Sequence, residues 1–214
     1  VAVRVPDDCI SAHANQSRIH QFDMNDKNNC MYSPDVISFA REKGYFDGVN
    51  KDFSFAKAYA PLDFGARRYC EARVWSYFNM FTARGNEFLP YILGDTDTPM
   101  PLFVKPDRKI SVQDVKNAMR DHYEGTPLDI SKDFGAGPYH TPYRLSPLSF
   151  KVGDKEYFNE RPISTQQSGF VFVAQMRSTL PDAIGGVLWF GTDDANMTVF
   201  TPVYCCTDKV PVCY

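Results

Sequence analysis

Residues 10–19 read ISAHANQSRI and gather polar side chains of a kind that could do chemistry. If this segment is extended, Ser11, His13 and Asn15 share one face, because side chains alternate along a strand. A hydroxyl, an imidazole and an amide would then lie together beside an apolar run, with Gln16 following directly. The alternative is an ordinary solvent-exposed strand face without a function. The segment therefore raises the question of a functional site without answering it.

Histidines and cysteines show no spacing that favours a metal site. His13 and His20 are seven residues apart, and His122, Glu124 and His140 do not form an H-E-x-x-H pattern. The six cysteines contain no C-x-x-C pair, which argues against a zinc ribbon and a thioredoxin-type site. We therefore expect neither a metal nor another cofactor.

The composition is that of a globular protein. Hydrophobic residues make up 43% and charged residues 23% of the 214 residues, so the chain can form a packed core. The net charge of −3, without a basic run, gives no electrostatic basis for binding nucleic acid through its phosphates. No run of 18 apolar residues occurs, so no membrane span is expected.

The first part of the chain is expected to be mainly helical. Two short strands are predicted at residues 1–5 and 10–14. Helices are predicted at residues 33–44, 65–81 and 111–125. The last two segments have apolar residues at helical spacing, and the first and last carry a capping residue at the start and a glycine at the end. The middle helix has the strongest apolar stripe of the three.

The last part of the chain is expected to be a β-sheet. Residues 126–162 lack any period and are predicted to be irregular. Three apolar runs follow, at residues 169–177, 185–193 and 196–205, and they favour adjacent antiparallel strands. Their nearly continuous hydrophobicity predicts that both faces of this sheet are buried. With no linker or repeat in the sequence, we expect one α+β domain over residues 1–214.

Several motifs together resemble peptidase family C69, a group of dipeptidases related to secernins. The motifs are HANQSRI, YSPDVISFAREKGYF, RRYCEARVW, HYEGTPLD and ERPISTQQSGFVFVAQMRSTLPDAIGGVLWFGTDDA. They cover most of the chain, and the last is long enough to be specific. The resemblance implies the N-terminal nucleophile hydrolase fold, in which two antiparallel sheets lie between helix layers in an αββα sandwich. It also implies hydrolysis of unblocked dipeptides.

The resemblance further implies a cysteine nucleophile that becomes the first residue after processing and uses its own α-amine as the base. A thiolate is intrinsically nucleophilic, so a neighbouring amine can replace a histidine in this role. Here residue 1 is Val1, and none of the six cysteines can supply a free α-amine. We therefore expect a middle or C-terminal portion of a longer dipeptidase, inactive without the missing N-terminal segment. The alternatives are a non-catalytic structural or peptide-binding module, and an amidase or acyltransferase of the same fold.

Two catalytic residues are implied by the resemblance. Asn15 matches the strand-end asparagine whose amide donates to the oxyanion in related amidases. Arg68 matches an arginine that lowers the pKa of the thiol or holds the substrate, with Arg73 as the second choice. A strand-end asparagine and surface arginines are the structural alternatives.

Three further residues are predicted to contact the substrate. His13 and Gln16 would border the pocket, and Arg177 could bind the carboxylate of a dipeptide or instead pair with Asp182. Cys70 is expected to be a buried free thiol, whereas the states of the three C-terminal cysteines stay open. A homo-oligomer is compatible with the sequence, which does not decide between the bacterial cytoplasm and export.

Overall fold

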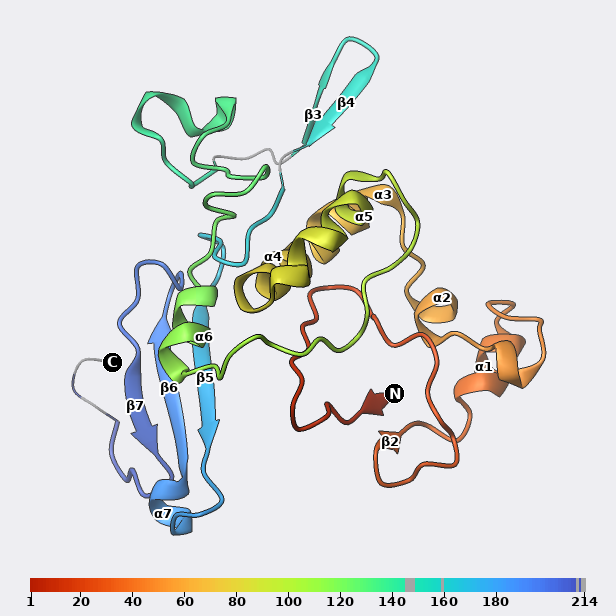
Figure 1. The fold of residues 1–214 in the computed structure, drawn as a ribbon, viewed down its shortest axis with the longest axis horizontal. Helices are drawn as coiled ribbons and strands as arrows, with labels where there is room; N and C mark the ends of the chain where they lie inside the picture. The colour runs from red at the N-terminus through yellow and green to blue at the C-terminus, as the bar shows by residue number, and fades with distance from the viewer. Residues whose placement is uncertain (145–148, 159, 211, 213–214) are drawn as a thin grey trace. The chain divides into compact units, whose positions relative to one another are not determined.

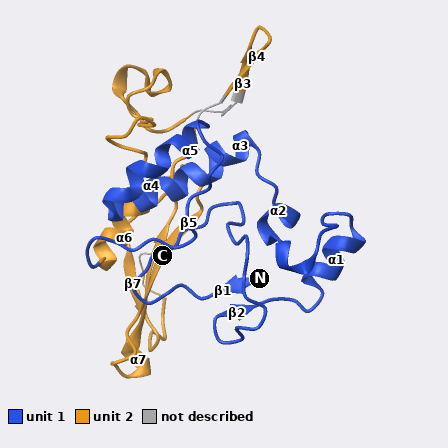
Figure 2. Ribbon diagram, turned by 45° about the vertical axis from the view of Figure 1, so that its right-hand side comes forward, with its two compact units in different colours: residues 1–109 blue, residues 110–214 orange. Residues whose placement is uncertain are grey.

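The computed structural model describes residues 1–144, 149–158, 160–210 and 212. The chain forms two compact units, Val1–Lys109 and Ile110–Tyr214, shown in different colours in Figure 2. We call them the N-terminal unit and the C-terminal unit. The described residues form helices and antiparallel strands, which confirms the α+β prediction.

The N-terminal unit is mainly helical, with one small antiparallel sheet (Figure 1). Its strands and α-helices are β1 (Ala2–Val3), β2 (Cys30–Met31), α1 (Val36–Glu42), α2 (Phe55–Tyr59), α3 (Phe64–Ala66), α4 (Ala72–Phe81) and α5 (Leu89–Leu93). Short 3-10 helices at Asn50–Asp52 and Ala83–Phe88 connect them. The helix predicted at residues 33–44 is confirmed by α1, whose buried face packs with Phe53 in one apolar cluster.

The helix predicted at residues 65–81 is confirmed as one helical run from α3 to α4. It begins at Asp63, whose carboxylate accepts a hydrogen bond from the backbone N–H of Ala66. Between α3 and α4 the chain forms a π-helical segment, Arg67–Glu71. The apolar stripe is buried as expected, with Trp75 and Phe78 fully enclosed. π-Helical turns are rare in proteins, and those that occur are often found at functional sites. This segment is therefore a candidate location for a functional site.

The strand predicted at residues 10–14 is wrong. Only Ile10 makes a bridge, to Val104, and the following residues leave the extended ladder. The reason is that their polar groups find other partners. Ser11 Oγ donates to the Leu102 carbonyl at 2.9 Å, and the Ala12 carbonyl accepts from Arg18 at 3.2 Å. Hydrogen bonds that involve side chains therefore replace, in this segment, the backbone hydrogen bonds of a β-ladder.

The C-terminal unit contains a three-stranded sheet, a hairpin and two α-helices (Figure 1). Its elements are α6 (Val112–Ala118), β3 (Ser149–Val152), β4 (Lys155–Phe158), β5 (Phe170–Met176), α7 (Asp182–Gly185), β6 (Gly186–Thr192) and β7 (Thr201–Tyr204), with a 3-10 helix at Phe134–Tyr139. The strands β5, β6 and β7 are adjacent and antiparallel, as predicted. The prediction of an irregular stretch at 126–162 missed the β3–β4 hairpin, whose turn includes Gly153 at φ 60°.

The sheet of the C-terminal unit has one covered face. Val171 and Val173 of β5 are buried against α6, whereas Phe170, Phe172 and Met176 alternate with them and are 60%, 50% and 80% exposed. The prediction that both faces are buried is therefore wrong for the described residues. Helix α6 packs on one face of this sheet. The continuous apolar runs predict two buried faces, but they do not identify the element that would cover the second face.

The helix predicted at residues 111–125 begins as expected and ends early. Ser111 and Asp114 form a capping box, but α6 ends at Ala118. Tyr123, predicted on the helix, has a left-handed φ of 66°, and its hydroxyl donates to the Arg161 carbonyl at 2.7 Å. Its fully buried ring is thus anchored outside the helix. The apolar spacing predicts a helix up to residue 125, but tertiary contacts of Tyr123 end it earlier.

The capping box gives a stability prediction. Ser111→Ala removes the acceptor for the Asp114 N–H, and we expect the free energy of unfolding to fall by about 0.5–2 kcal/mol. Urea unfolding followed by circular dichroism measures the change. Ser178→Ala, at an exposed turn of the same unit, is the matched control and should change stability by less than about 0.5 kcal/mol. Equal effects of the two substitutions would contradict a stabilising role for the cap.

Candidate functional site

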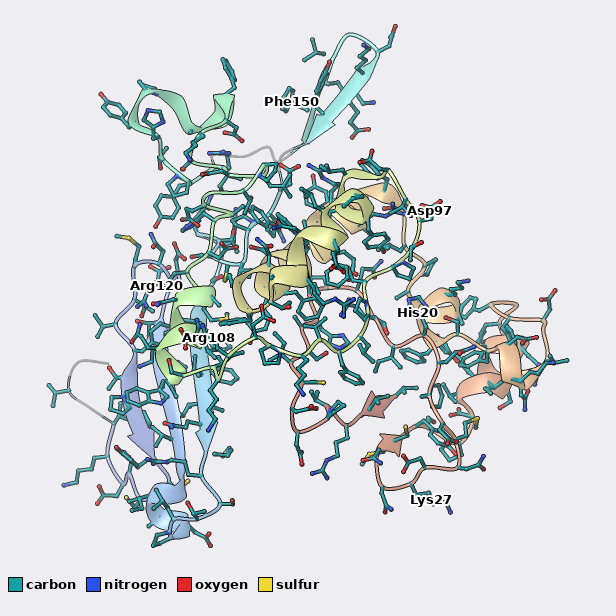
Figure 3. All side chains as sticks on the ribbon, in the orientation of Figure 1. His20, Lys27, Asp97, Arg108, Arg120 and Phe150 are labelled. Carbon is teal, nitrogen blue, oxygen red and sulfur yellow. The ribbon has the colours of Figure 1, made fainter. Side chains whose placement is uncertain are left out.

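A cavity of about 670 Å³ opens in the N-terminal unit. Its size lies within the range of about 300–1,000 Å³ that is usual for small-molecule sites. The wall includes Gln16 and Arg18 from the segment that follows Ile10, and Arg67 and Glu71 from the π-helical segment. Figure 3 labels two residues that line the cavity: His20, two positions after Arg18, and Asp97, from a further part of the unit.

Arg18 and Glu71 form a buried ion pair in this wall. Arg18 Nε lies 3.0 Å from Glu71 Oε2, and the two residues are 5% and 4% exposed. The guanidinium also donates to the carbonyls of Met100 and Pro101, and it lies over the ring of Phe78. Glu71 Oε1 is buried and has no hydrogen-bond partner among the described residues. A buried carboxylate is thus satisfied at one oxygen only.

Arg67 lies one helical turn before Glu71. Its Nη1 donates to the Tyr91 and Thr96 carbonyls at 3.3 and 3.1 Å, and its Nη2 lies 2.8 Å from Asp97 Oδ1. The guanidinium stacks on the ring of Tyr91 at 4.5 Å from the ring centroid. Its Nε is buried and makes no hydrogen bond within the described part of the chain. The same wall therefore carries one anion and one cation that each have an unused polar atom.

His20 contributes an imidazole to the cavity wall. Its Nδ1 lies 3.1 Å from Ser54 Oγ, which also caps α2 by accepting from the Lys57 N–H. Burial lowers the pKa of His20 below its usual 6.5, and the positive charges of Lys57 and Arg18 lower it further. The nearby Glu71 carboxylate opposes this shift, and the net lowering of the pKa favours the neutral imidazole.

Asn15, which precedes the cavity residue Gln16, is held by Arg73. Arg73 Nη2 donates to Asn15 Oδ1 at 2.6 Å, and Arg73 Nε donates to the Tyr69 carbonyl at 2.8 Å. The amide oxygen of Asn15 is thereby fixed, which directs its Nδ2 donor away from Arg73. Asn15 itself is exposed, and the next residue, Gln16, lines the cavity. The geometry presents an oriented N–H donor at the surface.

A sequence model of peptidase family C69 matches residues 1–214. The chain belongs to peptidase family C69. Curated proteins similar to this C69 chain include a "Probable dipeptidase" of Salmonella dublin, 33% identical over 95% of this chain and 41% of that protein. A "Probable dipeptidase" of Latilactobacillus sakei is 30% identical over 89% of this chain and 35% of its own length. "Dipeptidase A" of Lactobacillus helveticus is 25% identical, with coverages of 95% and 38%. The C69 chain thus spans about two fifths of these relatives.

Of the C69 residues that the sequence suggested, the structure places Gln16 in the cavity wall. Gln16 lines the cavity and donates to the Pro61 carbonyl at 3.3 Å. His13 is exposed as a residue and does not line the cavity. Partial desolvation of its ring, together with the charge of Arg18, lowers its pKa. Arg68 is half-buried outside the cavity lining and donates to the Ile92 carbonyl at 3.4 Å.

Arg177 lies in the C-terminal unit, at the end of β5. Its guanidinium donates to the Ile184 and Gly185 carbonyls and thereby holds the turn that leads into β6. The described residues show no ion pair between Arg177 and Asp182, so the backbone is the partner found here. The proposed contact of Arg177 with a substrate carboxylate stays a prediction.

The described cysteines are free thiols. Cys70 is buried, as predicted, whereas Cys205 and Cys206 are exposed, and Cys213 lies outside the described residues. Burial, with a hydrogen bond to Asp8, raises the pKa of Cys9 and so reduces its thiolate fraction. Among the residues that the structure describes, no three His, Cys, Asp or Glu side chains are placed to hold a metal ion. No helix in this part of the chain is long and apolar enough to cross a membrane.

Two residues of the cavity wall were missed as site residues. They are Arg67 and Glu71, which are not among the site residues predicted from the sequence. A signal was present for Glu71, because it precedes the fully buried Trp75 by four residues and Phe78 by seven, which places all three on one helix face. A carboxylate on the apolar face of a helix needs a buried partner, and Arg18 provides it.

Proposed function

We propose that the protein to which this chain belongs hydrolyses unblocked dipeptides by the N-terminal nucleophile mechanism. Membership of peptidase family C69 supports a peptidase, and the relatives' names support dipeptides as substrates. The observation that carries the proposal is the Asn15 amide, whose oxygen is fixed by Arg73, while the next residue, Gln16, lines a cavity of suitable size. A fixed amide donor beside a pocket is the arrangement that oxyanion stabilisation requires.

The proposed reaction uses a cysteine outside the six of this chain as the nucleophile. Its thiol transfers a proton to its own α-amine, and the thiolate sulfur attacks the scissile carbonyl. The oxygen of the tetrahedral intermediate accepts a hydrogen bond from Asn15 Nδ2. Collapse breaks the C–N bond, and the α-amine returns the proton to the leaving amine. Water then hydrolyses the thioester and releases the first amino acid.

Other residues have supporting roles in this proposal. Arg73 is a positioning residue, because it acts on the reaction through Asn15. Arg68 is proposed to favour the thiolate through its positive charge. Gln16 and His13 would border the substrate, with Gln16 already in the cavity wall.

We also propose that the C-terminal unit contributes to a four-layer αββα sandwich. The alternating apolar residues of β5 that are exposed here support this, because such a face is expected to be covered in the complete protein. In this proposal, residues 1–214 form part of one domain.

The proposed activity is tested with the full-length protein and a panel of L-Ala-L-Ala, L-Ala-L-Ala-L-Ala and N-acetyl-L-Ala-L-Ala. We expect release of free alanine from the unblocked dipeptide to be fastest. Binding of the dipeptide without turnover would favour the non-catalytic peptide-binding alternative. Faster hydrolysis of the tripeptide or of the acetylated dipeptide would contradict a dipeptidase.

A further inference from the structure

Three sulfur-containing side chains lie at one end of the three-stranded sheet, close to α7 (Figure 1). Met176 is the last residue of β5 and pairs with Gly186, the first residue of β6. Cys205 and Cys206 follow β7 directly. No sequence spacing predicts this group, because its members come from different strands and meet only when the sheet forms.

The missing side chain of Gly186 leaves a small gap between two of these sulfurs, which we call the notch. A Cβ atom at this position would lie 2.8 Å from Cys205 Sγ and 3.5 Å from Met176 Sδ, so both sulfurs border the same space. Cross-strand neighbours point to the same face of a sheet, which explains how they meet. The backbone of Gly186 is extended, with φ −96° and ψ 135°, so its conformation does not require a glycine. What the glycine provides is the space.

The cysteines beside the notch are exposed free thiols in a closed turn. The Thr207 N–H donates to the Tyr204 carbonyl at 3.0 Å and closes the turn around them. The Cys205 thiol donates to the Gly186 carbonyl at 3.6 Å, which keeps its sulfur at the notch. Adjacent residues have Cα atoms about 3.8 Å apart across a trans peptide, closer than the about 4.4–6.8 Å usual for disulfides. The two thiols are therefore poorly placed to bridge each other and are available as ligands.

The combination of thiol and thioether sulfur favours a soft metal ion. Thiolates and thioethers select Cu(I), whereas Zn(II) takes four ligands in a tetrahedron from Cys, His, Asp and Glu. No three side chains of the latter kinds are grouped among the residues that the structure describes. The Met176 side chain is flexible and the residue is 80% exposed, so its sulfur can adjust to a bound ion without disturbing the core. The group therefore fits Cu(I) better than Zn(II).

We infer that the thioether of Met176 and the thiolates of Cys205 and Cys206 bind one Cu(I) ion at the notch beside Gly186. Each thiol gives its proton to water as its sulfur binds the ion, and the metal stays Cu(I), so the step needs no oxidant or reductant. Affinity should therefore rise with pH. This site goes beyond the proposed peptidase activity and does not depend on it.

The test measures transfer of Cu(I) from a coloured chelator to the full-length protein. Under anaerobic conditions the Cu(I) complex of bathocuproine disulfonate is titrated with reduced protein, and the loss of its absorbance gives the copper bound. The cysteine nucleophile proposed above would take up Cu(I) equally in every variant, so each variant is compared with the wild type. We expect Cys205→Ser to lose the Cu(I) bound at the notch.

Further variants assign the other parts of the site. Met176→Leu and Cys206→Ser should each weaken this binding by about tenfold or more, because even residues outside the first shell of a metal are worth 10–100-fold in affinity. Gly186→Ala should weaken it as well, since the new Cβ atom fills the notch and displaces Cys205 Sγ.

Two matched controls accompany these variants. Met197→Leu removes another thioether of the C-terminal unit, at a residue that is 73% exposed. Cys9→Ser removes a half-buried free thiol of the N-terminal unit. Both should bind Cu(I) at the notch as the wild type does.

The outcomes decide the inference whether or not the protein hydrolyses dipeptides. Equal Cu(I) uptake by the wild type and Cys205→Ser would overturn it, as it would if the rest of the protein covered this end of the sheet. Equal effects of Met176→Leu and Met197→Leu would remove the thioether from the site. Zn(II) bound as tightly as Cu(I), with the same dependence on the three sulfur residues, would contradict a site that selects Cu(I).

Discussion

In the full-length protein, Asn15→Ala is expected to lower kcat for dipeptide hydrolysis by about 10²- to 10³-fold, because the developing oxyanion loses a prepositioned donor. KM should change little, since the donor acts mainly on the transition state. Steady-state kinetics with L-Ala-L-Ala measures both constants. Asn28→Ala, at another exposed asparagine of the N-terminal unit, is the control and should keep full turnover.

Arg73 provides an internal check on this prediction. If Arg73 acts by fixing the Asn15 amide, Arg73→Met should lower kcat in the wild-type background and have almost no further effect in the Asn15→Ala background. Additive losses in the double variant would show that Arg73 acts by another route. Full turnover of Asn15→Ala would remove the oxyanion role itself.

Arg18→Ala is expected to lower the free energy of unfolding by about 3–5 kcal/mol, because it leaves the buried carboxylate of Glu71 without its cation. The loss includes the hydrogen bonds that Arg18 donates to Met100 and Pro101. Chemical denaturation of the full-length protein, followed by tryptophan fluorescence, measures the change in unfolding free energy. Trp75 is a suitable probe because it lies on α4, which begins directly after Glu71.

The comparison for Arg18 is an exposed ion pair in the same unit. Arg84 and Glu87 contact each other at 3.2 Å with side chains 65% and 61% exposed. Arg84→Ala should therefore change the unfolding free energy by about 0–1 kcal/mol. Similar losses for Arg18→Ala and Arg84→Ala would mean that the buried pair contributes no more than a surface pair.

Helices with clear local signals could be predicted from the sequence. The segment at residues 65–81 carries a long apolar stripe at helical spacing, and Ser111 starts a capping box. Their starts are therefore set by neighbouring residues. The end of the third helix could not be predicted, because Tyr123 lies outside the helix and its hydroxyl donates to the carbonyl of Arg161, which is distant in the sequence.

The site was predictable only where one segment carries it. Asn15 and Gln16 stand in a single polar motif, and the structure places Gln16 in the cavity wall and Asn15 against Arg73. The side chains that contact this motif come from distant positions in the sequence: Arg73 contacts Asn15, and Glu71 contacts Arg18. Such pairs depend on tertiary packing, and the π-helical segment has no distinct sequence signal.

The most direct test of the proposed chemistry is site-mapped alkylation of the full-length protein. Iodoacetamide is added in steps, the remaining L-Ala-L-Ala hydrolysis is measured, and mass spectrometry identifies the modified cysteine at each step. We expect turnover to disappear in proportion to modification of one N-terminal cysteine that is not among the six of residues 1–214. Turnover that survives its modification, or that disappears with modification of Cys70 or another of the six, would contradict the N-terminal nucleophile mechanism.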